Sequence, residues 1–448
     1  MTRYMRRLRT SLRVGLVGVT VMSLAIALSP IPASAASAAA NIDQCTNGAV
    51  GPPISREPCL VGSVANTSGV LTKYANWVNG NSNGNKSHWT EGDFISYRVT
   101  VTGLTAASHT IVFHYDTIHG SKHAIDYVGS FDATETTSPT ATTFHRNANN
   151  PCADLLPSSQ CWAPGAAPPG PPTAPTSTFA VPPASLINCG GSAGTTPSQA
   201  AGRFQSFGPT GTTITGASYL AQNAPSGSGQ CSTAMSLTFT EPTANAPIVL
   251  AWGGHIASQA DWGSGNSATA ISGSPYHMAL DSLDGASTGS QDRALSTTAI
   301  FFPTATTTSL SASSISVGQS VFDTATVTGA APSAAGSVAF AVYSENTCTT
   351  AATTGVGGQI NAQPTQATFT NSSGTITATS SSVTFQQAAT YYWQATYSGD
   401  STNHTIGSKS ACLSEPVTVA SPHLTILRFR TNRSYSRCLW AVILATGM

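Results

Sequence analysis

Apolar residues recur at every second position through much of the chain, and this spacing limits the fold more than any other feature of the sequence. Ile111, Phe113 and Tyr115, for example, alternate with Val112, His114 and Asp116. The same period appears at Tyr97, Val99 and Val101; at Met235, Leu237 and Phe239; at Val338, Phe340 and Val342; and at Tyr391, Trp393, Ala395 and Tyr397. Successive side chains of a strand point to opposite faces of a sheet, so the alternation predicts half-buried β-strands. No long stretch after residue 35 has the spacing of an amphipathic helix, and an all-β fold is expected.

The first 35 residues have the layout of a secretory signal peptide. Five arginines precede an apolar stretch from Val14 to Leu28, and the small residues Ala33, Ser34 and Ala35 follow as a cleavage site. A membrane anchor is the alternative, but about 15 apolar residues fall short of the roughly 20 that span a bilayer. We therefore expect a protein that is secreted or held at the cell surface or cell wall, with no transmembrane segment in the mature chain.

The charge distribution argues against nucleic acid as a partner. The chain has 18 basic and 18 acidic residues, but nine of the basic ones lie in the signal segment or after Val419. Between Asp43 and Glu415 nine basic residues face 18 acidic ones, a formal net charge of −9. Binding phosphates requires clustered Lys and Arg, which this region lacks.

The nine cysteines fit an oxidising compartment. Cys348 and Cys412 are the sole candidates for a disulfide within residues 303–420, and Cys438 is left over in the tail. The first half holds six cysteines whose pairing stays open among 15 connectivities. These are Cys45, Cys59, Cys152, Cys161, Cys189 and Cys231. Metal binding is the alternative, but no CxxC pair occurs and the spacings are irregular.

The chain divides into four parts on composition. Residues 1–35 form the signal peptide, and residues 36–302 an N-terminal disulfide-bonded, β-sandwich-like domain with an exposed Pro/Ala-rich insertion near 163–185. A run of threonines after Phe302-Pro303 opens a second domain over 303–420. Residues 421–448 form an atypical basic tail that we interpret as disordered or frame-shifted; a short anchor or a thiol that pairs with a partner, at Cys438, is the alternative.

The second domain resembles the bacterial Ig-like repeats of secreted and wall-attached proteins. The segment Thr390 to Asp400, with its aromatic pattern followed by Tyr-Ser-Gly-Asp, carries the resemblance, and the opening around Thr308-Ser309-Leu310 and Val317-Gly318-Gln319 fits it. The resemblance implies an Ig-like sandwich of about 100 residues with a tryptophan, Trp393, in its core.

The first domain is similar to a domain that opens many uncharacterised bacterial surface proteins. The similarity rests on short segments such as Trp77-Val78-Asn79-Gly80, Ala251-Trp252-Gly253-Gly254-His255 and Gly273-Ser274-Pro275-Tyr276-His277. It implies location and architecture only.

The best candidate for a binding site is a group of aromatic, imidazole and carboxylate side chains near glycines. It comprises Trp252, His255, Asp261, Trp262 and His277. We expect these residues on Gly-rich loops, which present binding groups on a rigid β scaffold. The alternative, which we favour, is that the tryptophans pack the sandwich edge while His255 and Asp261 bond loop amides.

Two metal hypotheses are weaker. The four-residue step from His119 to His123, with His114 nearby, would suit zinc on a helix, but the segment has the pattern of strand, turn and strand. Acidic pairs near glycines, Glu91 with Asp93 and Asp281 with Asp284, leave calcium open, although none has EF-hand spacing. No cofactor is otherwise expected.

We expect a non-catalytic protein that mediates adhesion or display, binds an unknown extracellular protein or glycan, and uses the Ig-like domain as a spacer. No GxSxG elbow or other catalytic motif is present in the sequence. A carbohydrate-binding module is one alternative and requires Trp252 or Trp262 to face solvent. A metal-assisted hydrolase is another and requires His255, His277 and a carboxylate to converge.

Overall fold

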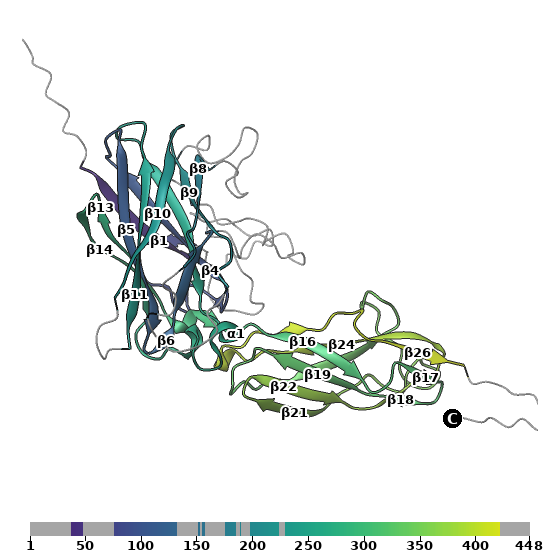
Figure 1. The fold of residues 1–448 in the computed structure, drawn as a ribbon. Helices are drawn as coiled ribbons and strands as arrows, with labels where there is room; N and C mark the ends of the chain where they lie inside the picture. The colour runs from purple at the N-terminus through teal and green to yellow at the C-terminus, as the bar shows by residue number, and fades with distance from the viewer. Residues whose placement is uncertain are drawn as a thin grey trace, which may run out of the picture. The chain divides into compact units, whose positions relative to one another are not determined.

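The computed structural model describes residues 37–47, 76–131, 151–152, 155–156, 175–184, 189, 198–223 and 229–421. The expected signal peptide, Cys59, Cys161, the first part of the Pro/Ala-rich segment and the tail after 421 lie outside the described residues. Among the described residues the fold is almost entirely β, as the alternation predicts, and helices are short (Figure 1). Within the same residues, no helix is long and apolar enough to cross a membrane.

The first half of the chain forms two antiparallel sheets. One has the strand order β2, β1, β4, β12, β9, β8, with β7 also paired to β12; the other has the order β10, β11, β5, β13, β14, with β6 paired to β5. The bounds in the first sheet are β1 Ala39–Thr46, β2 Asn76–Val78, β4 Phe94–Thr102, β7 Ile125–Gly129, β8 Ser177–Ala180, β9 Arg203–Phe207 and β12 Ile248–Ile256. Those in the second are β5 Ser108–His119, β6 Lys122–His123, β10 Thr213–Asn223, β11 Cys231–Thr240, β13 Tyr276–Leu283 and β14 Ala286–Leu295.

The two sheets pack face to face around one apolar core. Phe113 on β5 stacks on Trp252 of β12, with ring centroids 4.4 Å apart. Ile111, Phe113 and Tyr115 are buried while their neighbours are only half-buried, and β11 alternates in the same way. The predicted half-buried strands at these two places are therefore confirmed. We call this unit the first sandwich.

Several short elements complete the first sandwich. The helix α1, Gln259–Trp262, follows β12 directly, and the 3₁₀ turns η2, Ala268–Ala270, and η3, Thr297–Ala299, come later. β3, Trp89–Thr90, and β15, Ile300–Phe301, form a parallel pair. Cys189 and Cys231 are joined by a disulfide. Cys45 and Cys152 are each part of a further disulfide.

β4 differs from the sequence prediction, because both of its faces are buried from Phe94 to Val99. The outward side chain Arg98 is covered: it pairs with Asp43 at 3.0 Å, donates to the carbonyl of Pro151 at 2.9 Å and lies over the ring of Trp77. A buried guanidinium is tolerated when it is paired and hydrogen-bonded in this way. A short strand, β8, also occupies part of the segment that we expect to be an exposed insertion.

The second half of the chain forms its own pair of sheets. One has the order β16, β19, β22, β21, the other β17, β26, β24, β20 with β25 paired to β24, and β18 pairs with β23. The bounds are β16 Ala305–Leu310, β17 Ser314–Ser316, β18 Ser320–Val321, β19 Asp323–Thr328, β20 Val338–Tyr343, β21 Gln366–Ser372, β22 Thr375–Ser380, β23 Val383–Thr384, β24 Ala389–Tyr397, β25 Ser408–Lys409 and β26 Pro416–Ala420, with the turn η4 at Ser401–Asn403. We call this unit the second sandwich.

The core of the second sandwich follows the alternation in the sequence. Val338, Phe340 and Val342 on β20 are buried, and so are Tyr391 and Trp393 on β24. Cys348 and Cys412, the pair expected from the cysteine count, form a disulfide. No sheet formed by the described residues includes strands from both halves of the chain.

Gly253 and Gly254 lie inside β12, where neighbouring groups approach the backbone closely. A Cβ on Gly253 would collide with the backbone carbonyl of Ser130, and one on Gly254 would lie 3.1 Å from Cε2 of Tyr97. Glycine in a strand interior often marks such a close approach. The two glycines therefore serve packing in a central strand and do not indicate a loop.

We expect Gly253→Ala to lower the free energy of unfolding of the first sandwich by about 1–3 kcal/mol, because the added methyl group must displace backbone atoms. Gly80→Ala is the matched control, since nothing lies within 4 Å of a Cβ at that position. Chemical denaturation of the two variants and the parent chain checks this. Equal stability of both variants would contradict the close-approach explanation.

Candidate functional site

The residues predicted as one binding site are split between different parts of the first sandwich. Trp252 and His255 lie on β12, His277 lies on β13, and Asp261 and Trp262 belong to α1. The expectation that all five lie on Gly-rich loops is therefore wrong. The glycines beside Trp252 suggested a loop, but they allow β12 to pack closely against its neighbours.

Trp252 is a core residue. Its side chain is fully buried, and it contacts Phe113 and, at a centroid distance of 6.1 Å, Phe204. Trp262 is also buried, with 4% of its surface exposed. Neither tryptophan presents a ring face to solvent, so neither forms a platform for a sugar ring.

Three of the five residues gather around Asp126, a residue of β7 that was not predicted. Nδ1 of His255 lies 2.6 Å from Oδ1 of Asp126, and the indole Nε1 of Trp262 donates to the other oxygen, Oδ2, at 3.0 Å. Asp261 completes the group: one ligand atom each from Asp126, His255 and Asp261 lie within 4.8 Å of one another. We call these three residues and Trp262 the Asp126 cluster.

Local structure positions each member of the Asp126 cluster. β7 pairs with β12 in a register that places His255 opposite Tyr127, and this brings Asp126 beside the imidazole. Ser258 caps α1: its hydroxyl accepts from the backbone N–H of Asp261 at 3.2 Å and donates to Oδ2 of the same residue at 2.7 Å. The short helix therefore holds Asp261 beside its own cap.

Aromatic rings enclose the cluster. The ring of Tyr127 stacks on His255 with centroids 4.3 Å apart, and Phe94 contacts the same imidazole at 4.9 Å. His123 stacks on Trp262 at 3.5 Å. Burial lowers the pKa of His123.

The carboxylates control the charge of His255. Burial by itself lowers the pKa of His255, but the charge of Asp126 and its hydrogen bond outweigh that effect, with smaller contributions from Asp261 and Asp93, and the pKa is raised. Asp126 itself is completely buried, and both of its carboxylate oxygens have a partner, one in the imidazole of His255 and one in the indole of Trp262.

His277 belongs to a different group on β5, β13 and β14. Its Nδ1 lies 3.1 Å from Oδ2 of Asp116, and its Nε2 lies 3.9 Å from Asp292. His119 shares Asp116 at 3.3 Å and also contacts the hydroxyl of Ser274 at 2.9 Å. The hydrogen bond to Asp116 raises the pKa of His277. Among the described residues, His277 does not belong to the Asp126 cluster.

The histidines weighed as a zinc site are dispersed, which agrees with the strand prediction. His114 pairs with Asp281 at 2.7 Å, His119 pairs with Asp116, and His123 packs on Trp262. His114 and His119 lie on β5 and His123 on β6.

The acidic pairs weighed as calcium ligands are engaged in protein contacts. Glu91 accepts from the backbone N–H groups of Gln259 at 2.8 Å and Thr269 at 3.1 Å. Asp93 accepts from the backbone N–H of Thr90 at 2.7 Å. Asp281 pairs with His114, and Asp284 lies 2.6 Å from Nδ1 of His109. These carboxylates therefore brace turns and strands.

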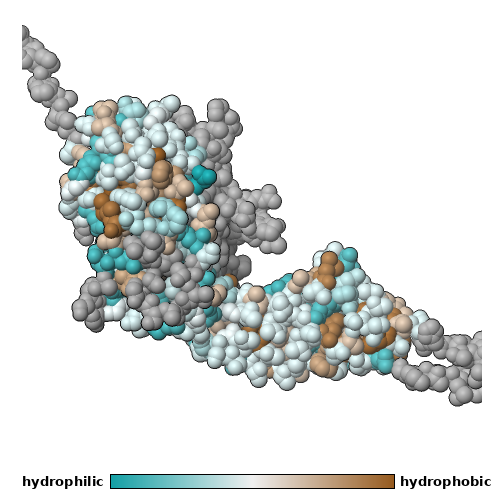
Figure 2. Space-filling model, viewed as in Figure 1, coloured by the Kyte–Doolittle hydropathy of each residue, from teal (hydrophilic) through white to brown (hydrophobic). Residues whose placement is uncertain are grey.

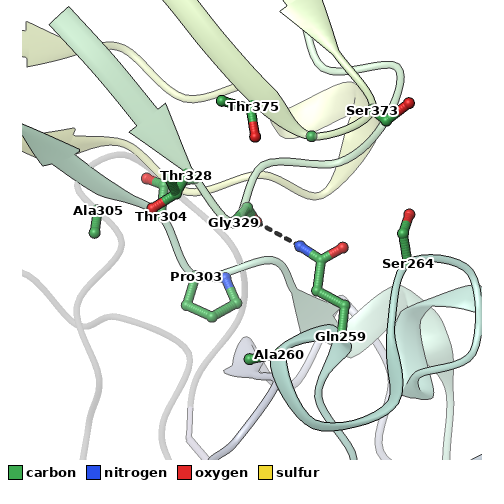
Figure 3. A pocket seen from close by; sticks show the side chains of 11 residues that line it. Gln259, Ala260, Ser264, Pro303, Thr304, Ala305, Thr328, Gly329, Ser373 and Thr375 are labelled. Carbon is green, nitrogen blue, oxygen red and sulfur yellow. Dashed lines mark hydrogen bonds between the residues drawn. The ribbon is translucent and has the colours of Figure 1, made fainter. Parts of the chain in front are cut away.

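A shallow pocket lies beside α1 (Figure 3). Gln259 on its wall donates from Nε2 to the carbonyl of Gly329 at 2.9 Å. The other lining residues are small or carry hydroxyl groups: Ala260, Ser264, Pro303, Thr304, Ala305, Thr328, Ser373, Gly374 and Thr375. Since this lining has no charged side chain, we assign the pocket no chemistry.

Comparisons with known proteins identify no family. No family model and no curated protein matches the sequence. Among solved structures, the chain is similar to the adhesin InvE of Yersinia pseudotuberculosis, with 11% sequence identity and a TM-score of 0.17, over 48% of this chain and 53% of that one. The match thus spans about half of the adhesin chain. A TM-score of this size is too low to identify a shared fold.

Proposed function

We propose that this chain is a non-catalytic protein secreted from the cell or held at its surface, where the first sandwich binds a protein or glycan and the second acts as a spacer. The observation that carries the proposal is the presence of a disulfide in each sandwich, Cys189 with Cys231 and Cys348 with Cys412. Structural disulfides persist in oxidising compartments and are rare in the cytosol.

The surface supports the proposal. On the face drawn in Figure 2, hydrophobic residues occur as separate patches on a mostly pale, weakly polar surface. The exposed strand β21 is rich in threonine and other uncharged polar residues. Such a surface stays soluble outside the cell without a high density of charge.

The second sandwich has a feature that favours an Ig-like spacer. The hydroxyl of Tyr391 donates to the carbonyl of Gln387, four residues upstream, at 3.0 Å. Ig-like domains have a similar feature, the tyrosine corner, in which a tyrosine near the start of a strand bonds through its hydroxyl to the backbone a few residues upstream. Trp393, two residues later, is fully buried in the same core.

The two alternative functions, carbohydrate binding and metal-assisted hydrolysis, each require an arrangement of side chains that differs from the one in the structure. Carbohydrate binding through tryptophan requires an exposed ring at Trp252 or Trp262, and both are buried. A metal-assisted hydrolase through His255 and His277 requires one shared carboxylate, but His255 pairs with Asp126 and His277 with Asp116.

To test the proposal, the full chain, produced in an oxidising compartment, should be applied to arrays of glycans and extracellular proteins with and without calcium. We expect saturable binding to one class of target. The double variant Cys348→Ser, Cys412→Ser should retain this binding, because it weakens only the proposed spacer. Absence of saturable binding under both conditions would instead favour a purely structural wall component.

A further inference from the structure

The Asp126 cluster has the dimensions of a metal site. The ligand atoms of Asp126, His255 and Asp261 lie within 4.8 Å of one another. Oxygen and nitrogen ligands lie about 2.0–2.2 Å from zinc, so two ligands of one ion are at most about 4.4 Å apart. Side-chain shifts of a few tenths of an ångström would therefore let one ion contact all three. We propose that Asp126, His255 and Asp261 bind a divalent transition-metal cation, a site that goes beyond the proposed adhesion function.

The charge of the three side chains suits a divalent ion. With a neutral imidazole, the two carboxylates carry two negative charges, which one divalent cation balances. Asp126 is completely buried and His255 is only 6% exposed, so an unbalanced charge among them is costly. One imidazole and two carboxylates form a ligand set of intermediate hardness, which suits Zn²⁺ or Mn²⁺ better than soft ions.

A second layer of contacts already orients all three ligands. Trp262 donates to Oδ2 of Asp126, Ser258 donates to Oδ2 of Asp261, and the ring of Tyr127 stacks on His255. Such outer contacts fix the orientation of metal ligands and exclude water from the site. The cluster differs in this respect from carboxylates that merely lie close together on a surface.

The ion would replace an existing contact. Nδ1 of His255 and Oδ1 of Asp126 are joined by a 2.6 Å hydrogen bond, and bonds from both residues to the ion would take its place. The bound ion would also link α1 to β7 and β12, since each element supplies one ligand.

The test is a titration of the full chain, without a histidine tag and after chelator treatment, with Zn²⁺, Mn²⁺ and Ca²⁺ in parallel. Calorimetry should give one equivalent of bound Zn²⁺, and the tryptophan fluorescence of the chain, to which Trp262 contributes, should change over the same range. The variant Asp261→Asn should bind at least tenfold more weakly. Asp261 is half-buried on a four-residue helix, so this variant is expected to fold.

The matched control is Asp284→Asn, an aspartate of the same sandwich that pairs with a histidine outside the cluster. It should keep the affinity of the parent chain. The proposal is overturned if no ion binds stoichiometrically, or if Asp261→Asn and Asp284→Asn bind Zn²⁺ with equal affinity, because the ion would then occupy other histidines. Neither result depends on the array experiment.

Discussion

Replacing Trp252 with alanine should lower the free energy of unfolding of the first sandwich by about 4 kcal/mol, since truncating a large buried aromatic side chain typically costs 3–5 kcal/mol. Trp252 is fully buried on β12, and it contacts Phe113 on β5 of the opposite sheet and Phe204 on β9. The cavity left by the indole would remove the packing contact between β12 and Phe113 on the opposite sheet.

The control for this prediction is Leu220→Ala on β10, since Leu220 is 53% exposed. Surface changes of this kind usually stay within about 0.5 kcal/mol. Calorimetric unfolding of the full chain compares the two variants. If Trp252→Ala unfolds at the same temperature as Leu220→Ala, Trp252 does not hold the sheets together and its role as a binding residue must be considered again.

The second sandwich should be less stable at pH 8 than at pH 5. Asp323 is completely buried at the start of β19, and burial together with the nearby charge of Glu415 raises its pKa to about 7. Burial also raises the pKa of Glu415. The folded chain therefore holds a proton that the unfolded chain, with an aspartate pKa of about 3.9, releases above pH 4. The resulting stabilisation is complete below about pH 4 and is lost as the pH rises through 7.

The variant Asp323→Asn should remove most of this pH dependence. Each unit of pKa shift corresponds to about 1.4 kcal/mol, and the two carboxyls share the effect, so we expect a gain of about 2 kcal/mol over the parent chain at pH 8. Glu415→Gln should act in the same direction, because either change leaves one titratable carboxyl in the pair. Melting temperatures measured between pH 5 and pH 8 check this. If the melting temperature of Asp323→Asn depends on pH as steeply as that of the parent chain, Asp323 is not the group that holds the buried proton.

The strands with clear alternation were predictable because a strand that is buried on one face has an apolar residue at every second position. β5, β11 and β20 follow this rule, and so does the all-β fold class. β24 follows it except at Gln394, which is buried between Trp393 and Ala395. β4 breaks it, because the salt bridge between Arg98 and Asp43 allows its outer face to be covered as well. A charged residue within an alternating strand gives no sign of whether a distant partner neutralises it.

The candidate site was only partly predictable. His255, Asp261 and Trp262 do come together, but Trp252 belongs to the core and His277 to another group. Asp126 was missed because it lies 129 residues before His255, and only the pairing of β7 with β12 joins them. Local spacing carries no information on such a register. The one available signal was that Asp126 lies between apolar residues in a strand, where a carboxylate needs a buried partner.

The proposed function requires the protein to be exposed outside the cell that makes it, and this can be measured. Intact cells can be treated with a protease that does not cross membranes, and the chain then followed with an antibody to the first sandwich, beside a cytoplasmic control protein. We expect the chain to be found in the medium or to be cleaved on intact cells, with the disulfide between Cys348 and Cys412 formed. A chain that is protected until the cells are lysed, and whose cysteines are reduced, would contradict the proposed function.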